Sequence, residues 1–337
     1  MRTTHQLAIC SAFLATVLAL GCRSETKETA TTTPTWTGTG GGGATTGTGG
    51  QGAGAGQTGT GGQGAQAGQT GTGGQGGEPP DPCQAGGDHL LISEIGTAPE
   101  DGEFIEIWNR GGSEIDLSAY YLSDNSVYYD IAAGKAWSPI TDNPNSDFLV
   151  QFPPGTKIGA GKVLVVQAGK GFETFWKSCP DFVMANADIT CGGDSVPAMA
   201  IPKNGGLGTD TGKYLTNDRE MLVLFCWGGK AATVKDVDYV TWGTTFEPGT
   251  RADKSGVAGY QADTAPDKQK PAPSYKFSNS PDAGTPAESI ARAGADESAE
   301  KSSGGNGLSG HDETSEDLGA AFSVQQKASP GVAPGGK

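Results

Sequence analysis

The chain has 337 residues, of which 56 are glycine, and its formal net charge is −15. Glycine therefore makes up about one residue in six, against about 7% in average proteins. Lysine and arginine together number 23, against 38 aspartate and glutamate residues. A protein that binds nucleic acid needs a basic face against the phosphates, so we expect no nucleic-acid partner.

Residues 1–21 are predicted to be a signal peptide. Arg2 precedes an uncharged apolar run over residues 7–20, which is shorter than the about 20 residues of a membrane-spanning helix and has the length of a signal-peptide core. The run ends in the sequence ALGC at residues 19–22, which resembles the lipobox of bacterial lipoproteins. This resemblance implies cleavage before Cys22 and lipidation of Cys22, with the membrane as partner. The alternative is a plain secreted protein with an incidental cysteine.

Residue 23 is arginine and not the aspartate that resembles an inner-membrane retention signal, so the lipobox resemblance implies the outer membrane, at the cell surface or its periplasmic face. Residues 22–82 are predicted to form a disordered tether after the lipidated cysteine. Between residues 38 and 77, 21 of 40 residues are glycine, and the unit GQTGTGGQG occurs at 56–64 and 68–76. The unit has no large apolar side chain to bury, which excludes a stacked repeat and favours a flexible linker.

Four cysteines remain in the part of the chain that follows. An exported protein with four thiols is expected to form two disulfides, for which three pairings exist. No C-x-x-C motif or close Cys/His pair indicates zinc instead. We favour a local and a long-range pair, Cys179–Cys191 and Cys83–Cys226.

Residues 83–337 are predicted to be an all-β domain. Short apolar or alternating runs are separated by Gly, Pro, Asn and Asp, a pattern typical of β-sandwiches and barrels. One segment, residues 172–177, is predicted to be helical. The expected strands are residues 89–95, 103–109, 120–123, 127–131, 148–152, 163–167, 221–227 and 237–242.

The order of these runs resembles the lamin-tail domain, an immunoglobulin-like β-sandwich. The resemblance implies that fold, with SIAR (289–292) and SPG (329–331) as closing strands. Residues 125–147, 170–213 and 244–288 would be long loop insertions, and loops of this length are typically functional or disordered. The polar run 294–318 is predicted to be a solvated loop. The segments that carry the resemblance are LLISEI (90–95), EFIEIWN (103–109), IDLSAYYLSD (115–124), FPPGTKIGAGKVLVV (152–166), LTNDREMLVL (215–224) and VKDVDYVTWG (234–243).

Two groups of residues are candidates for binding. Asp236 and Asp238 would share one face of a regular strand and, with Asp124 or Asp218 nearby, could ligate Ca²⁺; a solvated strand face is the alternative. No other cofactor is expected. Tyr128, Tyr129 and Trp137 are candidates for a protein or carbohydrate surface, with burial in the core as the alternative. In a strand, Tyr128 and Tyr129 would face opposite ways, so one of them would be exposed.

An enzymatic function is disfavoured, and we identify no catalytic residues. The run CGGDS (191–195) is similar to the nucleophile segment of trypsin-like proteases, but Val196 replaces the glycine that should follow Ser195, and outside the signal peptide only His89 and His311 could serve as a base. Glu106 lacks a second carboxylate that the sequence can place near it. The expected function is therefore a noncatalytic binding or structural lipoprotein. The alternatives are a Ca²⁺- or carbohydrate-dependent adhesin and a hydrolase.

Overall fold

Two β-sheets form the body of the computed structural model, which describes residues 81–84, 89–139, 145–184, 189–209, 212–217, 219–243, 249–273, 288–325 and 327–335. The predicted signal peptide, Cys22 and all of the tether before residue 81 lie outside these residues. The described residues belong to one compact unit, Thr72–Lys337. None of the helices among them is both long and apolar enough to cross a bilayer.

The first sheet has six strands, antiparallel except for β7 and β8. It contains, in spatial order, β15 (Phe322–Gln325), β14 (Ser289–Arg292), β1 (Leu90–Gly96), β2 (Phe104–Asn109), β7 (Val163–Gln167) and β8 (Phe182–Val183). The second sheet has five antiparallel strands: β11 (Gly206–Leu207), β5 (Phe148–Gln151), β4 (Tyr120–Ser123), β12 (Arg219–Cys226) and β13 (Lys235–Gly243).

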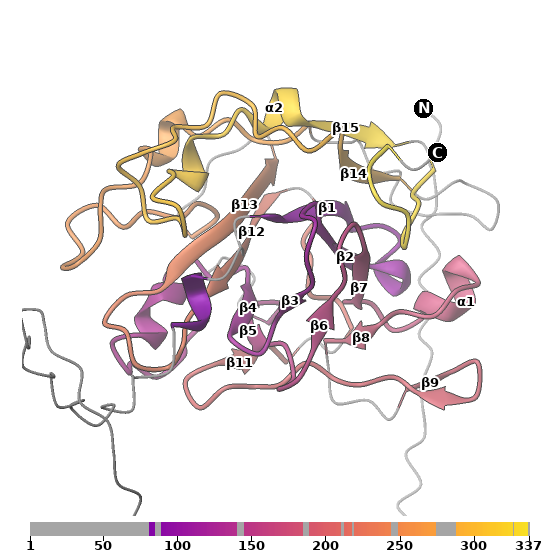
Figure 1. Ribbon diagram of the computed structural model, residues 1–337. Helices are drawn as coiled ribbons and strands as arrows, with labels where there is room; N and C mark the ends of the chain where they lie inside the picture. The colour runs from indigo at the N-terminus through magenta and orange to yellow at the C-terminus, as the bar shows by residue number, and fades with distance from the viewer. Residues whose placement is uncertain are drawn as a thin grey trace, which may run out of the picture. The chain divides into compact units, whose positions relative to one another are not determined.

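Smaller elements complete the structure (Figure 1). Two short ribbons pair β9 (Thr190–Cys191) with β10 (Asp194–Ser195), and β3 (Ile115–Asp116) with β6 (Lys157–Ile158). The helices are α1 (Phe172–Trp176) and α2 (Leu318–Ala321), with 3-10 turns η1 (Pro82–Gln84), η3 (Glu100–Gly102), η4 (Tyr128–Ile131), η5 (Pro266–Lys268) and η6 (Glu313–Ser315). The structure confirms the all-β, immunoglobulin-like sandwich with long insertions that the sequence predicts.

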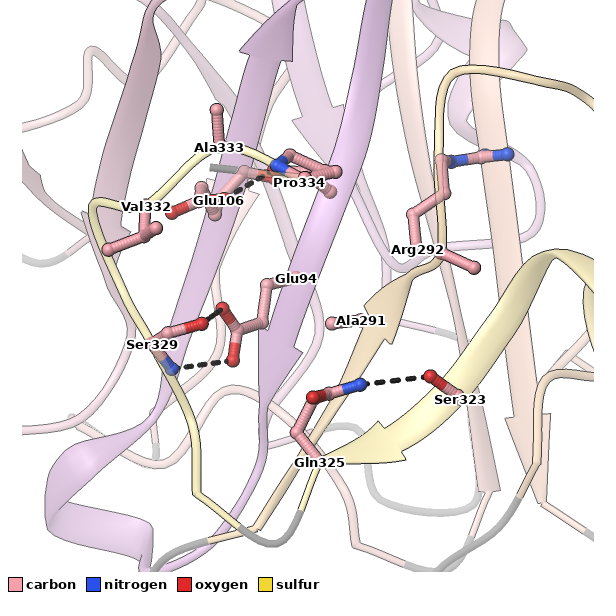
Figure 2. Close-up of a pocket in the computed structure, with 13 residues that line it drawn as sticks. Glu94, Glu106, Ala291, Arg292, Ser323, Gln325, Ser329, Val332, Ala333 and Pro334 are labelled. Carbon is pink, nitrogen blue, oxygen red and sulfur yellow. Dashed lines mark hydrogen bonds between the residues drawn. The ribbon is translucent and has the colours of Figure 1, made fainter. Parts of the chain in front are cut away.

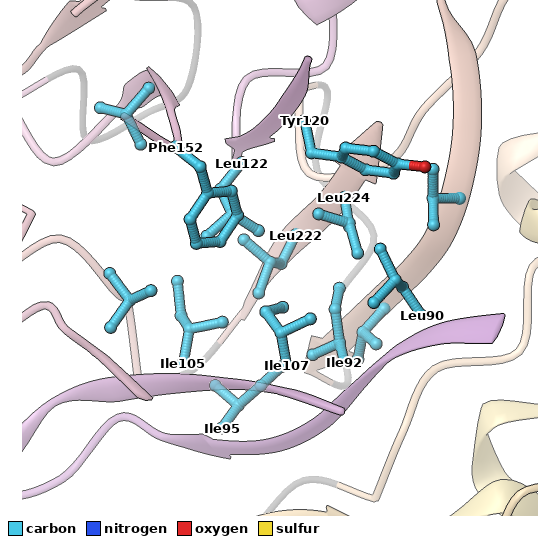
Figure 3. Packing of buried hydrophobic residues seen from close by; sticks show 14 of the residues in the cluster. Leu90, Ile92, Ile95, Ile105, Ile107, Tyr120, Leu122, Phe152, Leu222 and Leu224 are labelled. Carbon is cyan, nitrogen blue, oxygen red and sulfur yellow. The ribbon is translucent and has the colours of Figure 1, made fainter. Parts of the chain in front are cut away.

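The main hydrophobic core lies between the two sheets (Figure 3). In β2, Ile105 and Ile107 alternate with residues of the opposite face, as the period of a strand requires, and point at this core. Leu122 of β4 and Leu222 and Leu224 of β12 meet them from the second sheet. Because these apolar side chains are fully buried, their transfer from water is the main force that holds the sheets together.

Both outer faces are also covered. Phe104 and Val165 on the first sheet pack against Phe172 of α1. On the second sheet, Tyr121, Met221 and other outward side chains pack under η4 and part of the 249–273 segment. The long insertions therefore serve as cover for the sandwich. A strand that is covered on both faces reads as a continuous apolar run, as residues 221–226 do.

Two local predictions are wrong. Residues 127–131 form the turn η4 and not a strand, because Asn125 starts a turn: its Oδ1 accepts a hydrogen bond from the amide of Val127, and its carbonyl accepts one from the amide of Tyr128. The SPG segment at 329–331 forms no strand. The last strand is β15, which pairs with β14 along its whole length.

The structure contains both disulfides that the sequence favours. Cys179–Cys191 closes a short loop within the 170–213 insertion, and Cys83–Cys226 joins the start of the domain to the end of β12. The insertion at 170–213 is therefore pinned by a disulfide.

Candidate functional site

Two carboxylates stand side by side on the first sheet. Glu94 of β1 is paired with Glu106 of β2 in the register of the two strands. Ser93 is an extra residue at this point, since Ile92 pairs with Ile107 and Glu94 with Glu106. This bulge places the Ser93 hydroxyl where it donates to Glu106 Oε1 over 2.6 Å. The neighbouring strand thus supplies the second carboxylate that the sequence could not place.

The C-terminal segment binds to this carboxylate pair. Glu94 accepts hydrogen bonds from the amide and hydroxyl of Ser329 and from the hydroxyl of Ser289. Glu106 Oε2 accepts one from the amide of Gly331 over 2.7 Å. Figure 2 shows Ser329 hydrogen-bonded to Glu94; both carboxylates and Ser329 line a cavity of about 290 Å³. All four carboxylate oxygens therefore accept hydrogen bonds from the protein itself.

Burial raises the pKa of Glu106 to about 7, with a further contribution from the charge of Glu94. The Ser93 hydroxyl and the amide of Gly331 act in the opposite direction. A carboxyl with such a pKa could hold or release a proton near neutral pH. Its two oxygens, however, accept hydrogen bonds from Ser93 and Gly331. The carboxylate therefore helps to fix the C-terminal segment on the sheet.

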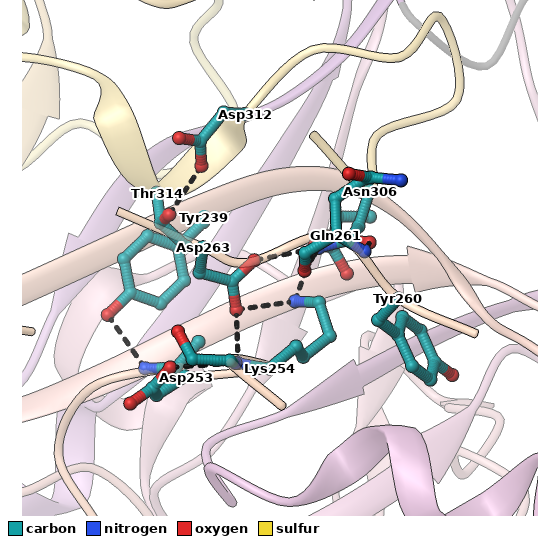
Figure 4. A network of polar contacts seen from close by, with 12 residues as sticks. Tyr239, Asp253, Lys254, Tyr260, Gln261, Asp263, Asn306, Asp312 and Thr314 are labelled. Carbon is teal, nitrogen blue, oxygen red and sulfur yellow. Dashed lines mark hydrogen bonds and ion pairs between the residues drawn. The ribbon is translucent and has the colours of Figure 1, made fainter. Parts of the chain in front are cut away.

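A second polar cluster surrounds the fully buried Lys254 (Figure 4). Its ammonium group contacts Asp236 at 2.8 Å, Asp263 at 3.0 Å and the Tyr128 hydroxyl at 2.7 Å. A lysine has three N–H donors, so these three acceptors use all of them. Burial lowers the pKa of Lys254, but Asp236 and Asp263 more than offset this and hold the pKa above its ordinary value. Asn306 donates to the second oxygen of Asp263 and ties the 294–318 run to this cluster.

A third cluster surrounds the buried Arg292 of β14. Its guanidinium contacts Asp238 at 2.9 Å and Glu316 at 2.6 Å, and it lies over the ring of Phe322. Asp238 Oδ2 also accepts the backbone amide of Ile92 over 2.6 Å. The cluster therefore joins both sheets to the segment that follows β14.

The prediction of a Ca²⁺ pair at Asp236 and Asp238 is wrong in its geometry. Leu224 of β12 pairs with Asp238 and Phe225 pairs with Asp236, so Val237 is an extra residue in β13. A bulge breaks the alternation of side chains, and the two carboxylates enter different clusters. Each has its own cation, Lys254 for one and Arg292 for the other. Of the acids expected nearby, Asp218 lies outside the described residues.

The expected aromatic surface is only partly formed. Tyr128 and Tyr129 are both buried, which corrects the expectation that one of them is exposed; Tyr128 instead donates its hydroxyl to Asp236 over 2.6 Å. Trp137 is half-buried. Together with Tyr128, it lines a cavity of about 200 Å³ within the 125–147 insertion. Tyr129 does not line this cavity and packs on Tyr260.

The ring of Trp137 packs directly on the backbone of a glycine in β11. A Cβ atom at Gly206 would lie only 2.4 Å from the Trp137 ring, so this position admits no larger residue without movement of the ring. Trp137 Nε1 is buried and has no hydrogen-bond partner among the described residues. A buried indole N–H without a partner costs stability, so the tight packing around this ring is not optimised for its polar group.

The polar run 294–318 is not a solvated loop. Asn306, Asp312 and Glu313 are among its buried residues. Bridges join this run to the rest of the domain at Asp236–Gly307 and Lys270–Asp317, and Figure 1 shows the orange and yellow segments side by side. The sequence gives no sign of this packing, because the partner groups lie tens of residues away.

The protease-like run forms the β9–β10 ribbon. Ser195 is exposed at the end of β10, and Cys191 is bound to Cys179.

Asn109 donates to the carbonyls of Ser113, Ile158 and Gly159. This residue thus holds loop backbone in place.

Two residues of these clusters, Glu94 and Lys254, are not predicted from the sequence. Glu94 could have been noticed as a charge inside an apolar strand, since a buried charge is rare unless it has partners. Lys254 lies in a polar loop, and the sequence carries no signal that this lysine is buried.

A comparison with solved structures finds similarity to a DUF4876 family protein from Bacteroides thetaiotaomicron VPI-5482, with 12% identity over 70% of each chain and a TM-score of 0.35. No curated protein matches the chain. Residues 84–243 match the family model described as Lamin Tail Domain, which agrees with the β-sandwich seen in the structure.

Proposed function

We propose that this protein is an exported lipoprotein that presents a noncatalytic lamin-tail-type sandwich as a structural or binding module. The observation that carries the noncatalytic part is the engagement of Glu94 and Glu106. Their four oxygens accept hydrogen bonds from Ser93, Ser289, Ser329 and Gly331. A general base needs an oxygen within reach of a substrate proton, and here the C-terminal segment occupies the place beside both carboxylates.

The sequence supports anchoring. Cys22 follows an apolar run of signal-peptide length, and the glycine-rich segment after it has the composition of a flexible linker. The two disulfides fit an oxidising compartment. A three-chain lipid anchor at Cys22 would hold the protein on the outer membrane, because each buried CH₂ group contributes about 0.8 kcal/mol.

The cavity beside Trp137 supports a binding role. Its partly buried indole, the neighbouring Asp130–Lys135 ion pair at 2.8 Å and the amide side chain of Asn204 combine an apolar wall with polar groups. Sites for small ligands and short polymer segments have this mixture. The partner is a protein or a polysaccharide of the envelope.

Lipidation is tested by growing cells that express the full chain with an alkyne fatty acid and detecting the label on the purified protein. Cys22→Ser is expected to abolish labelling and to release the protein from the membrane fraction. Cys10→Ser, within the predicted signal core, is the matched control and leaves both unchanged. Equal labelling of the Cys22→Ser protein would refute the anchor.

Binding is tested by capturing envelope protein and polysaccharide fractions on the full chain. Trp137→Ala is expected to reduce capture at least tenfold, whereas Trp227→Ala, which does not line the cavity, leaves it unchanged. Identical capture by the wild type and Trp137→Ala would remove this cavity as the binding site. Robust turnover in a panel of nuclease, protease and glycosidase substrates, lost in Glu106→Gln, would overturn the noncatalytic assignment.

A further inference from the structure

A group of carboxylates is buried where β13 meets the segment after β14. It consists of Asp238, Glu297, Glu300, Glu313 and Glu316. Arg292 pairs with Asp238 and Glu316, and Arg110 pairs with Glu297 at 2.6 Å. In the part of the chain that the structure describes, no such lysine or arginine contact reaches Glu300 or Glu313. The charges of these two carboxylates are therefore not compensated by a lysine or arginine, which is costly inside the protein unless another group compensates them.

Glu300 carries a separate sign of a missing ligand. Its side chain is 6% exposed. Its Oε1 atom is buried and no donor group among the described residues reaches it, while the Glu313 carboxyl lies against Glu300. Its Oε2 lies 3.1 Å from His311 Nδ1. Native proteins rarely leave a buried carboxylate oxygen unpaired, and a bound ion is one of the standard reasons for one.

The donor atoms lie close to one another. One ligand atom each from Glu300, His311 and Glu313 lies within 4.8 Å of the other two. Two ligands at about 2.0–2.2 Å from a metal ion, at octahedral or tetrahedral angles, lie about 3.0–3.5 Å apart. The 3.1 Å between Glu300 Oε2 and His311 Nδ1 already has this spacing.

The backbone fixes these side chains. The carbonyl of His311 accepts the amide of Gly307 over 3.0 Å, and the amide of Asp312 donates to the carbonyl of Lys301 over 2.9 Å. His311 and Glu313 therefore come from one side of this loop, and Glu300 comes from the other. A third carboxylate, Asp238, lies close to Glu313 and Glu297, but its oxygens already contact Arg292 and the amide of Ile92.

We propose that Glu300, His311 and Glu313 bind one divalent transition-metal ion, for which Zn²⁺ and Mn²⁺ are the test ions. An imidazole nitrogen with two carboxylates suits these ions, whereas Ca²⁺ takes oxygen ligands. The ion would tie residues 300 and 311–313 together, outside the stretch that matches the lamin-tail family.

The test uses the full chain, freed of metal with EDTA and dialysed. Titration calorimetry with Zn²⁺ and with Mn²⁺ is expected to show one equivalent bound at micromolar affinity for at least one ion, together with a rise in the melting temperature. His311→Gln, Glu300→Gln and Glu313→Gln are each expected to weaken this binding at least tenfold. His311→Gln is the deciding variant, because the His311 side chain is 33% exposed and a glutamine amide can still donate a hydrogen bond to Glu300.

His89→Gln and Glu114→Gln are the matched controls, since both residues are exposed and far from the three ligands in the sequence; they are expected to bind as the wild type does. Circular dichroism of each metal-free variant verifies the fold. The proposal is overturned if the wild type binds neither ion at 1 mM, if His311→Gln binds as tightly as the wild type, or if Ca²⁺ alone binds.

Discussion

Replacing Lys254 with methionine tests how much the buried ion cluster contributes to the stability of the folded protein. The substitution keeps the apolar stem and removes the ammonium group that contacts Asp236 and Asp263 at 2.8 and 3.0 Å. At an effective dielectric constant of 20, each contact corresponds to about 5–6 kcal/mol of gross Coulomb attraction. The desolvation of three buried charges cancels most of this in the native protein.

In Lys254→Met the two carboxylates stay buried and their desolvation is no longer compensated. Removal of one partner from a buried ion pair typically costs about 3–5 kcal/mol of unfolding free energy. Tyr128 still donates to Asp236, so we expect a value within this range. With a urea m-value of about 2–3 kcal/mol/M for a domain of this size, the midpoint falls by about 1–2 M.

The assay is urea unfolding followed by tryptophan fluorescence and circular dichroism. Lys157→Met is the matched control: Lys157 contacts Glu114 at the same 2.8 Å, but both side chains are more than half exposed, and exposed pairs contribute little. We expect no measurable change in its midpoint. If Lys254→Met shifted the midpoint no more than Lys157→Met does, the argument that burial makes this pair matter would be refuted.

Two further predictions concern the carboxylate pair and the disulfides. Burial raises the pKa of Glu106 to about 7 from 4.5, so between these pH values the folded protein holds a proton that the unfolded chain loses. The stabilisation that is present below pH 4.5 therefore falls as the pH rises to 7, by up to about 3 kcal/mol of unfolding free energy. Glu106→Gln should flatten this part of the curve of stability against pH, and an unchanged curve would contradict the raised pKa of Glu106. Removal of one disulfide by paired alanine substitutions should lower the unfolding free energy by an amount that grows with the logarithm of the number of residues in the closed loop. The expected loss is about 5 kcal/mol for Cys83–Cys226, with a sequence separation of 143, and about 3 kcal/mol for Cys179–Cys191, with a separation of 12. Chemical denaturation of each variant measures this loss of unfolding free energy. A larger loss for the short Cys179–Cys191 loop than for the long Cys83–Cys226 loop would argue against loop entropy as the cause.

The sequence predicts the strands of the sandwich well because their signal is local. β4 and β7 have the predicted bounds, and β1, β2, β5, β12 and β13 differ from them by a few residues. The failures arise where a distant partner decides the geometry. Val237 is an extra residue in β13 because of how that strand pairs with β12, and no feature of VKDVDYV itself indicates this bulge.

Polar residues are the harder case. Glu300, His311 and Glu313 lie in a run whose composition is typical of a solvated loop, and the burial of this run arises from contacts with β13. An exposed loop could have the same composition, so composition does not distinguish the two. Sequence pattern reports the apolar faces that form the core, whereas the buried charges become recognisable only once their partners are known.

The long-range disulfide has a mechanical consequence. Tension applied to the chain before Cys83 passes through the sulfur bridge to Cys226 at the end of β12. The 143 residues of sequence between these cysteines are therefore bypassed when the two ends of the chain are pulled apart. At about 3.5 Å per extended residue, about 500 Å of chain is withheld. A reductant would release this length, so the protein under force has a short extension in oxidising surroundings and a long one when reduced.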